Sequence, residues 1–318
     1  MKINLFDKKI LVTGGAGFIG SYIAKKLLNL GHKITIIDNL STGYKTNLHS
    51  EAKFIEGDVS KPETIKKLND FKFDAILHIA GQSSGEVSFE NPVIDLNSNV
   101  TSTLLLLDYA YKTNCTKFIY ASSVSVYGEQ LGKEQFSETD DLNPKSFYAV
   151  GKLASEHYLK IYKQQYGIDY TILRYFNVYG IGQNFNNLKQ GMVSIYLEQF
   201  LNNEFKEVLV KGSKDRFRDL CYIEDISNLT IMSLTDPRFN NEIFNIGTGI
   251  KTTVSEIISS IQKNLSTNKP VVFKDNTPGD QYGYYANVEK IKSLTNYKFI
   301  DFKTGLKEWM EWAKNNRA

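Results

Sequence analysis

Short apolar runs alternate with longer periodic stretches along the first half of the chain. The runs are rich in β-branched residues and apolar on both faces, which predicts buried strands. They cover residues 8–14, 32–39, 52–58, 73–80, 116–123 and 169–177. Apolar residues recur every three to four positions at 18–30, 99–113 and 147–166, which predicts helices. Buried strands separated by helices indicate a parallel sheet covered on both sides, a doubly wound α/β fold.

After about residue 176 the pattern loosens. We expect a helix at 190–203, a short pair of strands within 208–222, and helices at 253–264 and 303–316. The apolar stretch 242–249 reads as a buried strand that returns to the first sheet. We therefore predict a nucleotide-binding Rossmann domain over 1–176, to which about 224–248 returns, and a smaller, mainly substrate-binding lobe over 177–318.

Composition points to a globular protein with a small-molecule partner. The 318 residues are 42% hydrophobic, and 38 basic and 35 acidic residues are scattered without long blocks of one sign. Such a distribution offers no electrostatic footprint for nucleic acid or an acidic membrane surface. The isolated Cys115 and Cys221 speak against a metal site or a disulfide framework and suit a reducing, cytoplasmic location. No apolar run approaches the roughly 18–20 residues of a membrane span.

The segment ILVTGGAGFIGS is the first candidate site. Gly14, Gly17 and Gly20 follow a strand at three-residue spacing, and Phe18 and Ile19 begin the next helix. Glycines at such places allow a tight turn and close approach to a pyrophosphate, while the helix N-terminus presents free N–H groups to the phosphates. A purely structural turn is the alternative. The following strand favours nucleotide binding, because it ends in an acid at the distance that such sites require.

That acid is Asp38, which lies 18 residues beyond Gly20 and is followed by Asn39. A carboxylate here can accept hydrogen bonds from the adenosine ribose, and it repels the extra phosphate of NADP. We therefore expect NAD, with the nearby Lys45 as the one basic residue that works against this preference.

Further polar or small residues end the next strands. Asp58 and Val59 follow the third strand, where a carboxylate can accept from an adenine amino group; the alternative is an acid that begins a helix. Ala80 and Gly81 follow the fourth strand and are small enough to admit a cofactor. The fifth strand ends in the hydroxyl side chains Ser122, Ser123 and Ser125, at the sheet edge where ligands of such folds lie.

The segment SFYAVGK sets Tyr148 four residues ahead of Lys152. In a helix these positions lie on one face, so a phenol and an ammonium approach a common point. Most isolated pairs of this kind are ordinary surface residues. Here the glycine turn and the serine-rich strand end favour a functional pair.

Four segments together, TGGAGFIG, ASSVSVYG, YAVGK and LRYFNVYG, resemble the extended short-chain dehydrogenase/reductase superfamily, and within it the nucleotide-sugar epimerases typified by UDP-glucose 4-epimerase. The resemblance covers nearly the whole chain. It implies NAD as the cofactor and Ser123, Tyr148 and Lys152 as the catalytic set. It also implies cofactor contacts from Asn99, Ser122 and Tyr175, and contacts to the sugar nucleotide from Asn177 and Arg218. The helices that carry Asn99 and Tyr148 commonly form a two-fold bundle in this family, which predicts a homodimer.

The chemistry implied by the resemblance explains the spacing of Tyr148 and Lys152. A free phenol has a pKa of about 10, but an adjacent ammonium and a positive nicotinamide favour the phenolate. Tyr148 would take a proton from a sugar hydroxyl held by Ser123, while Lys152 also bonds the nicotinamide ribose. Related dehydratases and decarboxylases carry an extra acid near the catalytic serine. Val124 and Ser125 stand at those positions here, so epimerisation remains.

The second lobe is predicted to bind the nucleotide sugar. Arg216 and Arg218 lie two apart, on one face of a strand, and guanidinium groups suit phosphate oxygens; the alternative pairs them with Asp215 and Asp219. Many members of this family have an arginine before a G-D turn where this chain has Thr277. Either Arg216 replaces that arginine at the pyrophosphate, or the nucleotide is held differently.

Tyr284 aligns with the residue that borders the hexose 2-substituent in 4-epimerases of this family. A large side chain there favours UDP-glucose and UDP-galactose over N-acetylated sugars. The alternative is that Tyr284 only packs within the lobe.

Two other functions of the protein stay open at this point. They are an NAD(P)-dependent keto-sugar-nucleotide reductase and a non-catalytic NAD-sensing protein.

Overall fold

The computed structural model describes residues 7–130, 132–188, 190–274 and 282–316. Its seven-stranded sheet has the order β12-β7-β5-β4-β1-β2-β3. The strands are β1 (Lys9–Thr13), β2 (Lys33–Asp38), β3 (Lys53–Glu56), β4 (Ala75–His78), β5 (Lys117–Ser123), β7 (Asp169–Tyr175) and β12 (Glu242–Ile246). Pairing is parallel between β1 and both β2 and β4, between β2 and β3, and between β4 and β5. The strand order reverses direction at β1 and β4, the point where ligands bind in such sheets.

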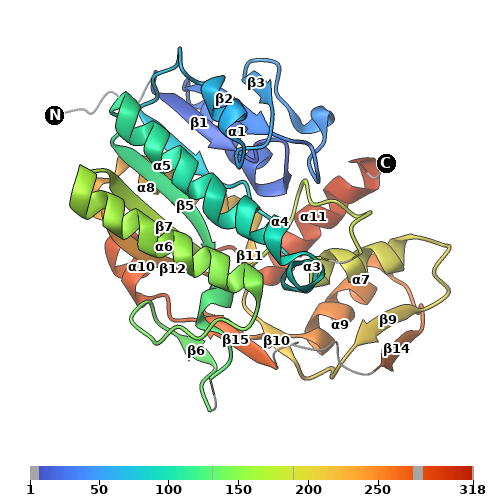
Figure 1. The fold of residues 1–318 in the computed structure, drawn as a ribbon. Helices are drawn as coiled ribbons and strands as arrows, with labels where there is room; N and C mark the ends of the chain where they lie inside the picture. The colour runs from blue at the N-terminus through green and yellow to red at the C-terminus, as the bar shows by residue number, and fades with distance from the viewer. Residues whose placement is uncertain (1–6, 131, 189, 275–281, 317–318) are drawn as a thin grey trace. The chain divides into compact units, whose positions relative to one another are not determined.

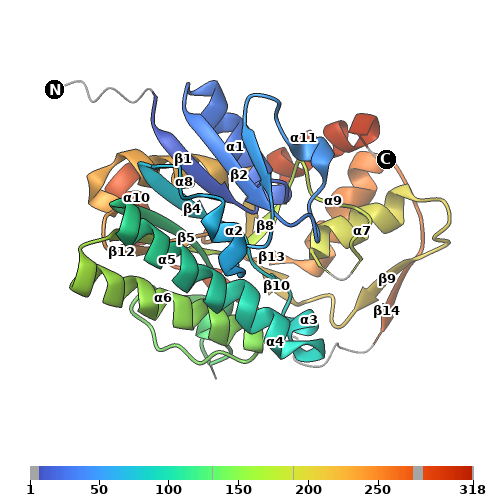
Figure 2. The ribbon, with the colours of Figure 1, turned by 45° about the horizontal axis from the view of Figure 1, so that its top comes forward.

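Helices cover both faces of this sheet (Figures 1 and 2). On one side α5 (Ser102–Thr113) and α6 (Phe147–Tyr166) run next to each other. On the other side lie α1 (Phe18–Asn29) and α8 (Ile223–Thr235). A hydrogen bond joins these two helices, in which Lys26 Nζ donates to Asn228 Oδ1 at 2.6 Å. The doubly wound α/β prediction is therefore confirmed. The strand predicted at 242–249 is β12, and it does return to the sheet beside β7.

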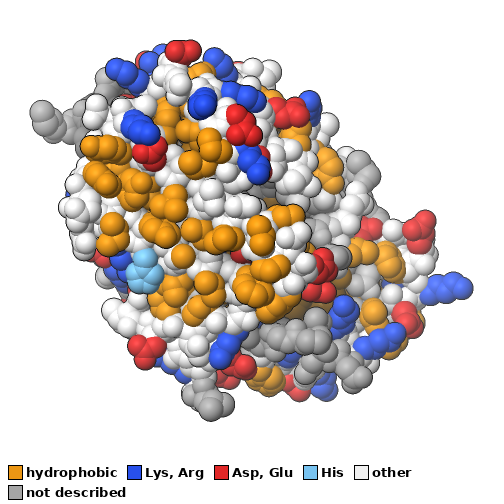
Figure 3. Space-filling model, in the orientation of Figure 1, with side chains coloured by type: hydrophobic (Ala, Val, Ile, Leu, Met, Phe, Trp, Pro, Cys, Tyr) orange, Lys and Arg blue, Asp and Glu red, His pale blue; other side chains and the backbone are white. Residues whose placement is uncertain are grey.

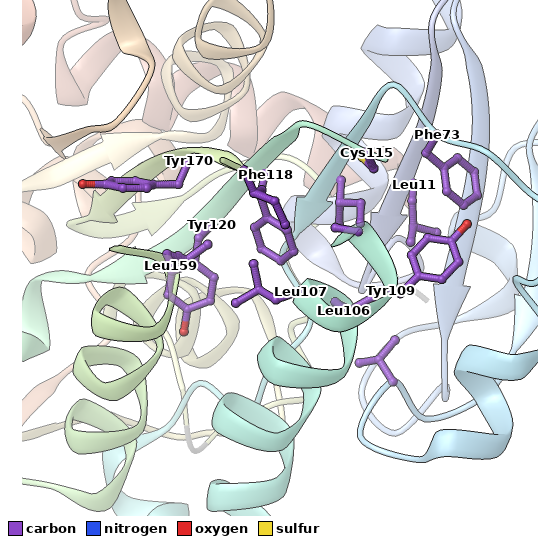
Figure 4. Packing of buried hydrophobic residues seen from close by; sticks show 14 of the residues in the cluster. Leu11, Phe73, Leu106, Leu107, Tyr109, Cys115, Phe118, Tyr120, Leu159 and Tyr170 are labelled. Atoms are coloured by element: carbon purple, nitrogen blue, oxygen red, sulfur yellow. The ribbon is translucent and has the colours of Figure 1, made fainter. Parts of the chain in front are cut away.

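A cluster of buried apolar residues lies between the sheet and helices α5 and α6 (Figure 4). Its members include Leu11, Ile76 and Phe118 from three strands, together with Leu107 of α5 and Leu159 of α6. These are the residues whose spacing predicted strands apolar on both faces and amphipathic helices. Their burial fixes α5 and α6 on the sheet, and α6 carries the candidate site.

The helix predicted at 99–113 is longer and less regular than its pattern indicates. Helices α3 (Gly85–Glu90) and α4 (Pro92–Leu96) precede it, and Asn97–Thr101 forms a π-helical turn that leads into α5. A π-turn widens the helix by one residue and is frequent at functional sites. The apolar periodicity of the chain does not reveal it.

The residues form two compact units. The first comprises 1–128, 142–174 and 227–244, and the second comprises 129–141, 175–226 and 245–318. The second unit holds a four-stranded sheet of order β13-β10-β15-β6 and two strand pairs, β11-β8 and β14-β9. Its strands are β6 (Gln135–Phe136), β8 (Asn177–Tyr179), β9 (Val208–Lys211), β10 (Phe217–Arg218), β11 (Leu220–Tyr222), β13 (Thr252–Thr253), β14 (Val271–Lys274) and β15 (Gly283–Ala286).

The helices of the second unit are α7 (Met192–Leu201), α9 (Val254–Leu265), α10 (Glu289–Thr295) and α11 (Phe302–Asn316). Helices α7, α9 and α11 lie where helices were predicted.

The predicted strand pair within 208–222 is wrong, because β9 pairs with the distant β14 while β10 pairs with β13 and β15. Sequence neighbours do not pair here, since the strand partners of β9 and β10 lie 34 or more residues away along the chain. The assignment of cofactor binding and substrate binding to separate domains stays a prediction.

Candidate active site

The glycine turn joins β1 to α1 at the switch point of the sheet. Gly14 has a φ of +70°, and a side chain there would place its Cβ 2.8 Å from the backbone of Ala80. At Gly20 a Cβ would lie 2.1 Å from the carbonyl oxygen of Gly14, so the helix packs directly on the turn. The first turn of α1, all of whose residues are described, has no acidic residue and no side-chain cap. Its N–H groups are thus available to an anion.

Asp38 ends β2 and is buried against this turn. Its Oδ2 accepts from the backbone N–H of Ala16 at 3.0 Å, and its Oδ1 accepts from that of Leu40 at 2.8 Å. A carboxylate can accept about four hydrogen bonds, so the Asp38 oxygens can still accept hydrogen bonds from ribose hydroxyl groups. Asn39 bonds the Ser41 backbone locally. Lys45 forms an ion pair with Glu56 at 2.9 Å, so its charge is compensated by that carboxylate.

The residues after β3 make a local turn. Asp58 Oδ1 accepts from Ser60 N–H at 2.8 Å, while helix α2 (Pro62–Lys66) begins only after Lys61. Asp58 therefore does not cap that helix directly. Val59 is buried in the apolar cluster. The adenine contacts of both residues stay predictions.

The ends of β4 and the π-turn meet beside Gly81. A side chain at Gly81 would place its Cβ 2.5 Å from Asn99 Oδ1 and 3.2 Å from Lys152 Nζ, so glycine is required for this close approach. The Asn99 amide donates to Gln82 O at 3.0 Å and to Asp95 Oδ1 at 3.1 Å. Its Oδ1 is buried and finds no hydrogen-bond partner in the described parts of the chain. An oriented acceptor of this kind fits a polar ligand group.

Helix α6 presents Tyr148 and Lys152 to the same region. Both side chains are buried, and Lys152 Nζ donates to Ala121 O at 3.0 Å. The ammonium lies 5.9 Å from the centre of the Tyr148 ring and 4.9 Å from that of Tyr120. Burial lowers the pKa of Lys152 to about 8, although the carboxylates of Asp95 and Glu156 raise it. The i, i+4 spacing thus does bring the phenol and the ammonium together.

Ser123 ends β5 and caps the short 3₁₀ turn Val124–Tyr127. Its Oγ accepts from Ser125 N–H and donates to Ser125 Oγ, both at 3.2 Å. Ser122 points elsewhere, because its hydroxyl donates to Glu156 Oε1 at 2.6 Å. Ser122 is therefore bound into the buried framework, and its contact with the cofactor stays a prediction.

The second unit holds the predicted substrate residues. Arg216, Arg218 and Tyr284 are all buried, and the Arg218 guanidinium lies 5.1 Å from the centre of the Tyr284 ring. Burial lowers the pKa of Arg216, and the charge of Arg218 lowers it further, while Tyr196 raises it.

Two other predicted residues lie on neighbouring strands of the chain. Tyr175 ends β7 and is buried, and Asn177 lies on β8, where its backbone N–H donates to Asp219 O at 3.1 Å. Thr277 lies outside the described residues.

Asp219 does not serve as the counter-ion that the alternative reading required. Its carboxylate accepts from Thr248 N–H at 2.7 Å, Thr248 Oγ1 at 2.6 Å, Gly249 N–H at 2.9 Å and Ala286 N–H at 3.0 Å. These four bonds fill its acceptor sites. Asp219 thus stabilises the loop after β12 and the end of β15, next to Tyr284.

Comparison with known proteins identifies the family. The model described as "NAD dependent epimerase/dehydratase family" matches residues 10–247. The chain belongs to this family. A Methanocaldococcus jannaschii protein is 36% identical over 308 residues, which cover 96% of this chain and 99% of that protein.

Two solved structures are similar along nearly their whole length. One is UDP-glucose 4-epimerase of Thermotoga maritima with UDP-glucose, which is 32% identical with a TM-score of 0.92 and covers 96% of this chain and 98% of its own. The other is UDP-N-acetylglucosamine 4-epimerase of Methanobrevibacter ruminantium with UDP-N-acetylmuramic acid, which is 31% identical with a TM-score of 0.88 and the same coverage. The predicted superfamily, the NAD dependence and the class of nucleotide-sugar epimerase are confirmed.

Sequence reasoning missed a buried framework around the Tyr–Lys pair. Arg174 of β7 donates to Glu156 through Nη2 at 2.6 Å and Nε at 3.0 Å, and its Nη1 donates to the Tyr127 hydroxyl at 2.9 Å. Burial works against the Arg174 charge, but its bonds to Glu156 raise the pKa of the guanidinium above its usual value. Glu156 stands four residues after Lys152, the same spacing as the recognised pair, and that signal could have found it.

Among residues 7–130, 132–188, 190–274 and 282–316 there is no group of three or more His, Cys, Asp and Glu side chains that could hold a metal ion. The same residues include no helix both long and apolar enough to span a membrane.

Proposed function

We propose that this protein interconverts UDP-glucose and UDP-galactose at the 4-position of the sugar, through a keto-sugar intermediate. The observation that carries the proposal is the buried Lys152 ammonium, which lies beside the Tyr148 ring, Asn99 Oδ1 and Gly81 at one end of the sheet. A buried acid/base pair at the ligand-binding edge of a Rossmann sheet suits proton transfer at a sugar hydroxyl.

The described residues fit a dinucleotide. The uncapped N-terminus of α1 and the glycine turn would hold the pyrophosphate, and Asp38 would hold the adenosine ribose. The unpartnered Asn99 Oδ1 and Lys152 would face the nicotinamide end. NAD, when bound, supplies a reversible hydride acceptor.

In the proposed mechanism Tyr148 accepts the proton of the 4-hydroxyl, and Ser123 donates a hydrogen bond to the same oxygen. The Lys152 ammonium stabilises the phenolate of Tyr148, because the site is buried and the charges attract strongly there. After the keto sugar has turned over, Tyr148 returns the proton to the same oxygen, while the carbon would regain hydride on its opposite face. Arg216 and Arg218 are proposed to bind the diphosphate.

The turn after β5 favours epimerisation over water elimination. Val124 is buried, and the Ser125 hydroxyl accepts from Ser123. Neither side chain is a carboxylic acid that could protonate a leaving hydroxyl.

A nucleotide-sugar panel read by NMR tests the proposed function. We expect UDP-glucose and UDP-galactose to interconvert with no net change in the absorbance of reduced nicotinamide. A keto-sugar reductase would instead consume reduced nicotinamide stoichiometrically, and that result would overturn the proposal.

We also propose a homodimer. Exposed apolar side chains cover neighbouring surfaces of α3 to α6 (Figure 3): Phe89, Val93, Ile94, Leu96, Tyr111, Phe147, Val150, Tyr158, Ile161 and Tyr166. Aromatic contacts link parts of this patch, with ring centres 5.7 Å apart for Phe89 and Phe147 and 4.5 Å apart for Tyr111 and Tyr166. Apolar patches of this extent mark protein interfaces.

A further inference from the structure

A buried carboxylate beside the candidate active site has no part in the mechanism so far. Asp95 lies near the end of α4, one helical turn before Asn99, and its side chain belongs to a residue that is only 1% exposed. Its Oδ1 accepts both of its hydrogen bonds, from Gln82 Nε2 at 2.9 Å and from Asn99 Nδ2 at 3.1 Å. Its Oδ2 is buried and has no hydrogen-bond partner among the described residues.

The hydrogen bonds alone do not require a carboxylate. An asparagine at position 95 could accept both bonds through its own Oδ1. What a carboxylate adds is negative charge, and burying a charge is unfavourable unless an opposite charge compensates it. The structure should therefore hold a cation close to Asp95.

That cation is Lys152. Lys152 Nζ and Asn99, whose amide donates to Asp95 Oδ1, both lie beside Gly81, because a Cβ at Gly81 would lie 3.2 Å from Lys152 Nζ and 2.5 Å from Asn99 Oδ1. Gly151, which precedes Lys152 on α6, lies against Asp95, because a Cβ there would lie 3.3 Å from Asp95 Oδ2. Burial raises the pKa of Asp95 and Lys152 lowers it, while Asp95 is the larger of the two carboxylate influences that raise the pKa of Lys152. The two side chains thus interact electrostatically.

The other groups facing Lys152 cannot replace Asp95. Glu156, on α6 itself, already forms a bidentate ion pair with Arg174. Tyr120 of β5 and Tyr148 of α6 present ring faces. His78 of β4 is neutral, since burial lowers its pKa to about 3 and Lys152 lowers it too.

We propose that Asp95 is a positioning residue that keeps the Lys152 ammonium charged within the buried site and fixes the Asn99 amide with its oxygen toward the ligand. The significance of Lys152 and Asn99 for catalysis rests on the proposed function. The electrostatic coupling of Asp95 to Lys152 does not, and it can be measured without substrate.

Removal of the Asp95 charge should shift the titration of Lys152 downward. The pKa of Lys152 is about 8 with both carboxylates present. Without Asp95 only burial and Glu156 act, so the ammonium loses its proton at lower pH, by about one pH unit. The alkaline limb of the pH–rate profile should move in the same direction.

The test is an NMR titration of protein labelled with ¹³C at the lysine side chains, for wild type and Asp95→Asn. Lys152→Met assigns the Lys152 signal. Lys117 is an internal control, because burial also lowers its pKa to about 8 but its carboxylate neighbours are Asp169 and Asp236. We expect the Lys152 midpoint to fall and the Lys117 midpoint to stay. An unchanged Lys152 midpoint would overturn the proposal.

Further variants separate charge from packing. Asp95→Glu keeps the charge and should keep the alkaline limb near its wild-type position. Asp95→Ser, which removes the charge with a smaller side chain, should reproduce the shift even if Asp95→Asn does not fold. Asp108→Asn, which breaks the exposed pair with Lys112, should leave both midpoints unchanged. A shift in Asp95→Glu as large as in Asp95→Asn would show that packing is responsible, and the proposal would fail.

The outcomes distinguish this inference from the proposed function. Wild-type protein that epimerises no nucleotide sugar contradicts the proposed function, whereas the Lys152 titration still decides the role of Asp95. Active wild-type protein with no shift in Asp95→Asn contradicts this inference alone.

Discussion

At the scale of single residues, Tyr148 carries the proposed chemistry through one hydroxyl group. Tyr148→Phe should lower the epimerisation rate by about 10²- to 10⁴-fold, because an acid/base group is lost while the ring beside Lys152 remains. NAD content, measured after protein denaturation, should stay at the wild-type level. Tyr158→Phe on the exposed side of the same helix is the matched control and should keep full activity. Near-normal turnover of Tyr148→Phe would remove Tyr148 from the mechanism.

Tyr284 is the residue proposed to select the sugar. It lies under the Arg218 guanidinium and contacts Phe176 edge-on, with ring centres 6.1 Å apart. Tyr284→Ser should raise kcat/KM for N-acetylated UDP-hexoses relative to the plain sugars, since a smaller side chain leaves room for the acetamido group. The exposed Tyr282→Ser is the control. A ratio that stays at its wild-type value in Tyr284→Ser places the selection elsewhere.

At the scale of elements, the Arg174–Glu156 pair ties β7 to α6. Both side chains are fully buried, and Ser122 of β5 joins the same carboxylate. Arg174→Met should lower the free energy of unfolding by about 3–5 kcal/mol, because Glu156 is left as an uncompensated buried charge. Denaturant titration measures the change.

The double variant Arg174→Met/Glu156→Leu should recover part of that loss, because both buried charges are then gone. Arg238→Met breaks an exposed pair with Asp236 and should leave the free energy of unfolding unchanged. If Arg174→Met and Arg238→Met behave alike, the buried pair does not stabilise the junction of β7 and α6.

At the scale of the whole molecule, the exposed patch on α3 to α6 predicts self-association. Sedimentation at micromolar protein should give about twice the 36.2 kDa chain mass. Ile161→Glu, within the patch, should shift the protein to monomer, because a buried charge has no partner at a two-fold interface. Ile250→Glu, on an exposed loop of the second unit, is the matched control. A monomeric wild type would contradict the homodimer.

Much of this protein follows from local patterns along its chain. The period of the apolar residues determines the strands and helices of the sheet, the glycines determine the turn from β1 to α1, and the spacing of Tyr148 and Lys152 places both on one face of α6. These features depend on residues within a few positions of one another, so backbone geometry and side-chain periodicity are sufficient to predict them.

Tertiary structure alone decided the surroundings of that pair. Asp95 and Lys152 are 57 residues apart in the chain, and neither the π-turn at Asn97–Thr101 nor the pairing of β9 with β14 has a periodic signature. Arg174 reads from sequence as one polar residue in a strand, yet it is buried against Glu156 of another element. The physical reason is that burial and charge pairing depend on which distant segments pack together. The chemistry of Lys152 is therefore set by neighbours that its own segment does not contain.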